Sequence, residues 1–283
     1  MNLVGALQNP RLSFKKAIGK LRRWTVSIPH DGVIEQMKGG VSFEHKRLVF
    51  LDDEDIRAML THSYDISLCE YFRKHLSQGD IVLDVGANVG YVSAVAASCV
   101  GTSGEVHGFE PLFRCFERLQ VLRKLNPQFH LFFNNVAAGA EKGLASISFD
   151  SRGDLRNASM VPGKQRPEAQ EVPVWRLDDY IAEHIVSPER IKIIKIDVEG
   201  FEFSVLRGLE RFFAASVSKP LIICEIKPWE IRKLGYTMKD FDQYMKKFGY
   251  QAYSMILEEN LIDLAALPDM DTVVFRCESG RGS

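Results

Sequence analysis

A glycine-containing turn follows a short apolar run of the sequence. Asp84 ends the run Ile81-Val82-Leu83, and Gly86 and Gly90 then frame a tight turn into a helix that begins near Tyr91. Glycine adopts positive φ without strain and lets the backbone approach a ligand closely. The amide groups of a helix N-terminus point toward such a ligand. The pattern predicts a binding loop at the carboxyl end of a strand, where open α/β sheets bind their ligands.

A second acid stands where the next apolar run ends. Glu110 closes residues 105–109 and lies 20 residues after Gly90. A carboxylate at this spacing suits the two hydroxyl groups of a ribose. A glycine turn alone is a weak signal. A turn and an acid that each end an apolar strand together predict an adenosine-containing ligand.

The glycine spacing of the loop distinguishes between adenosine cofactors. A dinucleotide fingerprint requires Gly-x-Gly-x-x-Gly, but the three positions here are Gly86, Asn88 and Tyr91. S-adenosylmethionine carries no phosphate, and it needs a close turn for its amino acid portion and an acid for its ribose. The loop therefore predicts S-adenosylmethionine as the cofactor. A nicotinamide oxidoreductase of similar architecture is the alternative that this spacing disfavours.

Several segments together resemble the motifs of one family, the FkbM family of class I methyltransferases. The segments are Asp84–Gly90, Phe109-Glu110-Pro111, Arg176–Tyr180, Ile194–Glu202 and Cys224-Glu225-Ile226. The resemblance runs from about Tyr64 to Met255 and leaves residues 1–60 outside. It implies a Rossmann-like α/β fold, with a seven-stranded, mostly parallel sheet, helices on both faces and an antiparallel last strand. It also implies O-methylation of a sugar, glycolipid or secondary-metabolite hydroxyl.

The resemblance also implies which residues bind the cofactor. The methionine end is assigned to Asp84, Gly86, Asn88 and Gly90, the ribose to Glu110, and the adenine to Asn135 and Val136, with Ala87 and Pro111 completing the set. The acceptor is expected to be a small molecule or a glycan. Methylation of nucleic acid or protein, and a non-catalytic module that only binds the cofactor, are the alternatives.

Methyl transfer to a hydroxyl requires correct placement and benefits from a general base. Asp197 ends the strand 192–197, and Glu199 and Glu202 follow it. We expect Asp197 to lie near the methyl group as the catalytic carboxylate, with Glu199 as its alternative or support. Glu202 is expected to be an ordinary surface acid of the following helix.

A divalent metal is the less favoured variant of this chemistry. Asp197 and Glu225 end neighbouring predicted strands and could supply two oxygen ligands. The sequence identifies no third ligand, so no metal site is predicted. No histidine has a recognisable acid partner, and none is nominated as the base.

The elements that must position these residues alternate between strands and helices. Strands are expected at 81–84, 105–110, 129–136, 192–197, 221–226, 250–256 and 272–277, and helices at 63–76, 91–100, 112–125, 199–213 and 237–248. Nearly continuous apolar strands in this rhythm indicate a parallel sheet covered on both faces. Residues 139–173 predict a long loop or weak hairpin that contributes acceptor contacts. Residues 47–51 could form a strand, and residues 52–55 an acidic turn.

The composition restricts the class of protein and its partners. The 283 residues are 46% hydrophobic and 26% charged, with a net charge of -1. A dedicated nucleic-acid binder usually shows a basic excess, so no nucleic-acid partner is expected. Five cysteines without a C-x-x-C pair predict free thiols in a reducing compartment, and hence a cytoplasmic protein. The oligomeric state is left open.

The N-terminal region differs from the rest of the chain. Residues 11–24 carry six basic and no acidic side chains, with apolar residues at helical spacing. Such a helix either contacts the anionic inner face of a membrane peripherally or packs on the main domain. We therefore expect an N-terminal extension at 1–62, a methyltransferase domain at 63–277 and a frayed tail at 278–283.

Overall fold

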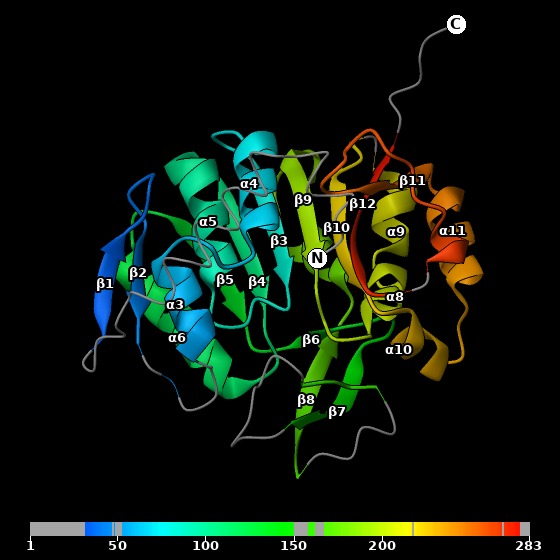
Figure 1. The fold of residues 1–283 in the computed structure, drawn as a ribbon, viewed down its shortest axis with the longest axis horizontal. Coiled ribbons are helices and arrows are strands. Elements are labelled where there is room, and N and C mark those ends of the chain that lie inside the picture. The colour runs from blue at the N-terminus through cyan, green and yellow to red at the C-terminus, as the bar shows by residue number, and fades with distance from the viewer. Residues whose placement is uncertain are drawn as a thin grey trace, which may run out of the picture.

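A seven-stranded sheet forms the centre of the protein in a computed structural model (Figure 1). The structure describes residues 32–46, 48, 53–149, 158–161, 167–216, 218–267 and 269–277. The strand order is β11-β12-β10-β9-β3-β4-β5. These strands are β3 (Ile81–Val85), β4 (Glu105–Phe109), β5 (His130–Asn134), β9 (Ile191–Ile196), β10 (Leu221–Ile226), β11 (Tyr250–Ser254) and β12 (Asp271–Cys277).

The strand directions confirm the predicted fold class. β3, β4, β5, β9 and β10 pair in parallel. β12 runs antiparallel to both of its neighbours, β10 and β11. The carboxyl ends of β3, β4, β9 and β10 therefore meet at one edge, which lies toward the bottom of Figure 1. The fold is a class I methyltransferase α/β sheet with its last strand antiparallel.

Helices cover both faces of the sheet because each strand buries side chains on both sides. One apolar cluster packs α4 (Ile66–His75), α5 (Tyr91–Val100) and α6 (Phe113–Leu125) against one face. The other packs α7 (Leu177–His184), α8 (Glu202–Arg207), α9 (Glu210–Ala215), α10 (Pro228–Lys233) and α11 (Met238–Lys247) against the opposite face. Short 3-10 helices lie at Gly101–Ser103, Pro188–Arg190 and Leu264–Ala266. This double cover explains the nearly continuous apolar strands.

Residues that the structure describes ahead of the predicted boundary at 62 contribute side chains to the core of the main domain. A hairpin of β1 (Val33–Gln36) and β2 (Ser42–His45) leads to α3 (Asp53–Leu60). Buried side chains of this segment, such as Phe43 and Ile56, belong to the same cluster as α4 and α5. The acidic turn expected at residues 52–55 is wrong, because residues 53–55 form the first turn of α3. Acids in a first helical turn are favourable beside the positive end of the helix dipole.

The predicted interruption at 139–173 contains a hairpin that stands below the main sheet in Figure 1. β7 (Gly143–Phe149) pairs antiparallel with β8 (Glu168–Trp175), and the short β6 (Ala137–Ala138) pairs in parallel with β8. The structure thus shows the hairpin alternative rather than an irregular loop.

The prediction of a single helix at 199–213 is wrong. Glu199 and Gly200 have φ of 58° and 105°, so the helix begins only at Glu202. The Gly208 carbonyl accepts a hydrogen bond from the backbone N–H of Asp178 and does not continue a helical ladder. The chain therefore forms two short helices, α8 and α9.

Some predictions lie outside the described residues. They are the basic helix at 11–24, the tail at 278–283 and most of the strand at 47–51. Within the described part of the chain, each helix is too short or too polar to cross a bilayer.

Candidate functional site

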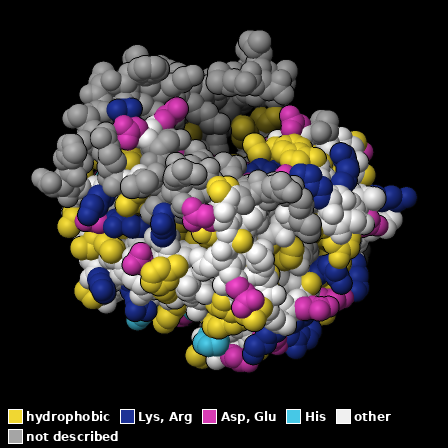
Figure 2. Space-filling view, turned by 90° about the horizontal axis from the view of Figure 1, so that it is seen from below, with side chains coloured by type: hydrophobic (Ala, Val, Ile, Leu, Met, Phe, Trp, Pro, Cys, Tyr) yellow, Lys and Arg dark blue, Asp and Glu magenta, His cyan; other side chains and the backbone are white. Residues whose placement is uncertain are grey.

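A cavity of about 510 Å³ opens at the carboxyl ends of β3, β4, β9 and β10. Most of the predicted site residues line it: Gly86, Ala87, Asn88, Gly90, Glu110, Pro111, Val136, Asp197 and Glu199. Figure 2 shows this end of the molecule, where the coloured acidic and basic side chains are interspersed and form no continuous basic patch. No histidine of the described chain lines the cavity.

The glycine turn after β3 has the backbone geometry that its sequence predicts. Gly86, Asn88 and Gly90 have φ of 80°, 50° and 88°. A Cβ atom on Gly86 would lie 1.9 Å from the carbonyl oxygen of Asp197, and one on Gly90 would lie 2.7 Å from a methyl carbon of Leu119. Both glycines are therefore required by positive φ and by close packing. They bring the backbone of the loop to the wall of the cavity.

Glu110 braces this loop from the end of β4. Its carboxylate accepts hydrogen bonds from the backbone N–H groups of Asn88 and Leu112, each at 2.9 Å. Burial raises the pKa of Glu110 to about 7, although these two donors act in the opposite direction. A carboxylate offers about four acceptor positions on its two oxygens. Glu110 can therefore hold the loop and still accept a hydrogen bond from a ligand.

Two residues assigned to the cofactor do not line the cavity. Asp84 is fully buried, and its carboxylate accepts a hydrogen bond from the Ser93 hydroxyl at 2.6 Å. The Asn135 side-chain amide donates to the carbonyl groups of Glu110 and Pro111, each at 2.9 Å. Both side chains therefore support the segments that form the wall. The contact of these two residues with the cofactor stays a prediction, because neither side chain lines the cavity.

Lys195 is a central residue of the site that the sequence interpretation missed. Its ammonium donates to the Gly86 carbonyl at 2.7 Å and lies 3.2 Å from Asp84 and 3.7 Å from Asp197. Burial lowers the pKa of Lys195, but the charges of Asp84 and Asp197 outweigh it and raise the pKa above its ordinary value. The signal was a second lysine in β9, placed among isoleucines of a central strand, since lysine is almost never buried unless paired.

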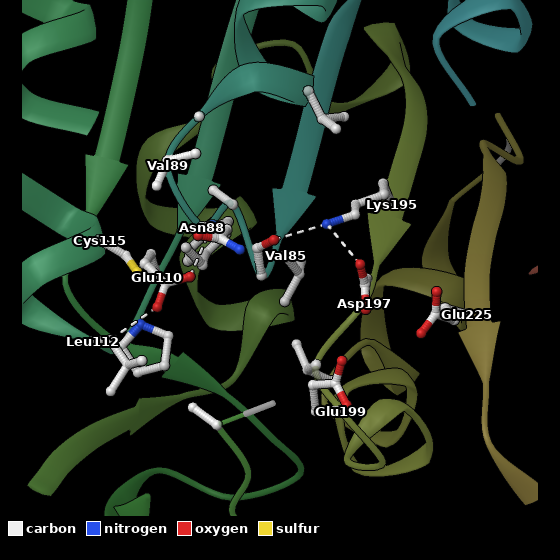
Figure 3. A pocket seen from close by; sticks show the side chains of 18 of the residues that line it. Val85, Asn88, Val89, Glu110, Leu112, Cys115, Lys195, Asp197, Glu199 and Glu225 are labelled. Carbon is white, nitrogen blue, oxygen red and sulfur yellow. Dashed lines mark hydrogen bonds and ion pairs between the residues drawn. The ribbon is translucent and has the colours of Figure 1, made fainter. Parts of the chain in front are cut away.

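Three carboxylates gather on the side of the cavity opposite Glu110 (Figure 3). Asp197, Glu199 and Glu225, which we name the acid wall, each offer an oxygen within 4.8 Å of the other two. The structure thus supplies Glu199 as the third oxygen ligand that the sequence did not identify. Lys227 stands among them, and its ammonium lies 2.5 Å from Glu199 and 3.1 Å from Glu225.

The three acids of the wall differ in their surroundings. Asp197 is 37% exposed and extends from the end of β9. Glu199 pairs with Lys227 and is held at positive φ. Burial and the nearby charge of Asp197 raise the pKa of Glu225. Asp197 is therefore the most accessible carboxylate of the wall.

The expectation that Glu202 is a surface acid is wrong. Glu202 is 1% exposed and lies beneath the turn that carries Asp197 and Glu199. Its Oε1 accepts hydrogen bonds from the backbone N–H groups of Val198 at 3.2 Å and Gly200 at 2.8 Å. Burial raises its pKa to about 7. Periodicity missed this role because the helix begins later than predicted and Glu202 faces its own N-terminal turn.

The hairpin region adds apolar side chains to the cavity wall. Ile147 of β7, together with Ala158 and Met160, faces the cavity from the hairpin region. Ala58 of α3 and Tyr64 close another side. The hairpin region thus contributes wall residues where acceptor contacts were predicted.

Comparison with known proteins identifies the family. The family model of the methyltransferase FkbM domain matches residues 84–252, which is more than half of the chain. The chain belongs to the FkbM methyltransferase family. A second model, of protein-L-isoaspartate(D-aspartate) O-methyltransferase, matches residues 34–131. This FkbM-family protein is therefore an S-adenosylmethionine-dependent methyltransferase, which confirms the predicted enzyme class and cofactor.

Individual relatives are more distant. The AMB antimetabolite synthetase AmbE of Pseudomonas aeruginosa is 29% identical over 180 residues, which are 52% of this chain and 8% of that protein. Among solved structures, Aeropyrum pernix fibrillarin with natively bound S-adenosyl-L-methionine has a TM-score of 0.38 and 13% identity, covering 71% of this chain and 67% of that one. A TehB-like methyltransferase from Corynebacterium glutamicum has a TM-score of 0.41 and 12% identity, covering 78% of this chain and 94% of that one.

Proposed function

We propose that this FkbM-family methyltransferase methylates a hydroxyl oxygen of a small-molecule or glycan acceptor. The observation that carries the proposal is the position of Asp197 across the cavity from Glu110 (Figure 3). The cofactor, when bound, supplies a methyl group already activated on a sulfonium. What the protein must add is alignment of the acceptor and removal of its proton.

Asp197 is proposed as the group that takes the proton. It is the accessible member of the acid wall, and Lys195 lies 3.7 Å from its carboxylate. The same lysine donates to Gly86 in the cofactor loop, so one buried cation links the base to that loop. Glu199 is less suited to this step because it forms an ion pair with Lys227. Its role is proposed to be support of the wall.

The opposite side of the cavity is proposed to hold the cofactor. The turn at Gly86 to Gly90 would receive the methionine end, and Glu110 would accept hydrogen bonds from the ribose. Pro111 and Val136 line the cavity beyond Glu110 and would border the adenine. Gly86 and Gly90 leave no space for a Cβ atom, so the loop packs tightly against the Asp197 turn and α6 and its backbone lines the cavity.

The acceptor is proposed to be a small metabolite or sugar on the basis of the wall chemistry. Carboxylates on one side and Ile147 and Met160 on another suit a molecule with hydroxyl groups and an apolar part. The similarity to a segment of an antimetabolite synthetase is consistent with a metabolite. The match to a protein methyltransferase model ends at residue 131, before the acid wall, and does not bear on the acceptor.

The proposal is tested by methyl transfer from radiolabelled S-adenosylmethionine. Separate pools of small metabolites, glycans, lipids, RNA and protein are incubated with the purified enzyme. Incorporation into metabolites, glycans or lipids is expected. Incorporation only into RNA or protein would overturn the proposed acceptor class.

A further inference from the structure

Lys227 lies among the carboxylates of the acid wall. It follows β10 directly and precedes α10, and it lines the cavity with its side chain only 12% exposed. Its ammonium contacts Glu199 at 2.5 Å and Glu225 at 3.1 Å. Two acids, one after β9 and one in β10, are thus joined by one partly buried cation.

Three converging carboxylates are also the arrangement that a divalent ion requires. Magnesium and calcium bind carboxylate oxygens at about 2.0–2.6 Å, and the oxygens of the acid wall lie within 4.8 Å of one another. Such an ion would need Glu199 and Glu225, the same two acids that already contact Lys227. An ion and the ammonium therefore compete for the same oxygens.

We propose that Lys227 is the permanent cation of the acid wall, taking the place of a divalent metal and positioning the acceptor hydroxyl. An ammonium has three N–H donors, and Glu199 and Glu225 use two of them among the described residues. The third is available to an acceptor oxygen in the cavity. The inference has two halves. The cation half, that Lys227 takes the place of a metal, does not rest on the proposed function, whereas the acceptor half, that Lys227 positions the acceptor hydroxyl, does.

The neighbouring carboxylates keep the Lys227 side chain positively charged. Burial lowers its pKa, but the hydrogen bond and charge of Glu199 and the charge of Glu225 outweigh burial and raise the pKa. The side chain therefore stays charged at neutral pH. Because like charges repel strongly at short distance in a partly buried site, a divalent ion that binds the wall must first displace the ammonium, which weakens its binding.

The cation half is tested with Mn²⁺ alone, whose binding is measured by electron paramagnetic resonance. Wild-type protein is expected to bind Mn²⁺ weakly at this wall. Lys227→Met should bind it about tenfold or more tightly, because the substitution removes the cation that contacts Glu199 and Glu225. Lys233→Met is the matched control, since Lys233 ends α10, the helix that Lys227 precedes, pairs with Glu230 and does not line the cavity. Its affinity for Mn²⁺ should equal that of the wild type.

Two results overturn the inference. One is tight, stoichiometric binding of Mn²⁺ by the wild-type protein, with loss of that binding in Asp197→Asn. This result does not depend on whether any lysine variant folds. The other is unchanged Mn²⁺ affinity in Lys227→Met, with binding of S-adenosylhomocysteine showing that the variant is folded.

The acceptor half is tested by kinetics once labelled product is obtained. Lys227→Met should raise the KM for the acceptor about tenfold or more and leave cofactor affinity unchanged, while Lys227→Arg should recover part of the loss. Equal KM values in wild type and Lys227→Met contradict acceptor positioning. If no hydroxyl acceptor exists, the proposed function fails while the Mn²⁺ experiment still decides the cation half.

Discussion

The ammonium of Lys195 lies 3.2 Å from the carboxylate of Asp84, and both side chains are buried in the centre of the sheet. Lys195 also contacts Gly86 in the cofactor loop and approaches Asp197. The pair therefore lies directly behind the cavity and joins its two sides. The arrangement connects the stability of the core to the geometry of the site.

Substitution Lys195→Met should destabilise the protein by about 3–5 kcal/mol, because it leaves Asp84 buried without its cation. The double variant Lys195→Met/Asp84→Asn should recover part of this loss, since it removes the stranded charge. Urea denaturation measures both. Lys74→Met removes an exposed ion pair with Glu258 and should cost less than about 1 kcal/mol. A Lys195→Met variant as stable as the wild type would show that the pair contributes little.

Gly86→Ala should abolish cofactor binding and destabilise the fold. The new Cβ atom would lie 1.9 Å from the Asp197 carbonyl, so either the cofactor loop or the turn that follows β9 must move. Gly235→Ala is the control, because Gly235 has a similar φ of 83° and no atom within 4 Å of an added Cβ. It should show only the backbone strain of about 1 kcal/mol. Thermal unfolding and calorimetry with S-adenosylhomocysteine separate the two effects. Equal losses in both variants would contradict the close approach of loop and turn.

Glu110→Ala should weaken S-adenosylmethionine binding by about tenfold or more, because it removes both a loop brace and the proposed ribose acceptor. Isothermal titration calorimetry gives the affinity. Glu105→Ala, at the opposite end of β4 and outside the cavity, should bind normally. Wild-type affinity in Glu110→Ala would remove this residue from cofactor binding.

Asp197→Asn should lower kcat by about 10²–10⁴-fold, the usual contribution of a general base, and leave cofactor affinity nearly unchanged. The substitution keeps the size of the side chain and removes its basicity. Asp179→Asn, on α7 and outside the cavity, is the control for loss of a charge. Unchanged turnover in Asp197→Asn would exclude it as the base.

Glu202 should make stability fall as pH rises. The folded-state pKa is raised from 4.5 to about 7, so between these values the native state binds a proton that the unfolded state has released. Stability from this group is therefore present below the unfolded pKa and is lost as pH rises through the folded one, by up to about 3 kcal/mol. Glu202→Gln keeps an acceptor for Val198 and Gly200 and should lose less stability between about pH 5 and pH 7.5.

Denaturation curves at the two pH values check this, with Glu183→Gln as an exposed control on α7. The same dependence in wild type and Glu202→Gln would show that the buried charge is not its source.

The sequence predicted the sheet well because its strands are short apolar runs separated by helices with clear stripes. The loop at Gly86 and the acid at Glu110 were predictable because motif residues sit next to those strands. The expected family, fold class and cofactor are confirmed. These features depend on local sequence alone.

Features that depend on contacts between distant segments were not predictable in the same way. Lys227 follows Glu225 by two residues and carries no motif, and only the fold brings it to Glu199. Glu202 has the spacing of a surface helix, and only the late helix start turns it inward. Gly208 ends a helix because its carbonyl bonds to Asp178, 30 residues earlier in the chain.

The atom that receives the methyl group tests the central claim most directly. The enzyme is incubated with S-adenosylmethionine carrying an isotopically labelled methyl group and with the acceptor pool that incorporates label. The product is then analysed by nuclear magnetic resonance. The account predicts a methyl ether, with the label bonded to a former hydroxyl oxygen, and formation of the same product at least about 10²-fold more slowly by Asp197→Asn. A labelled methyl group on nitrogen, sulfur or carbon, formed equally well by Asp197→Asn, would contradict it.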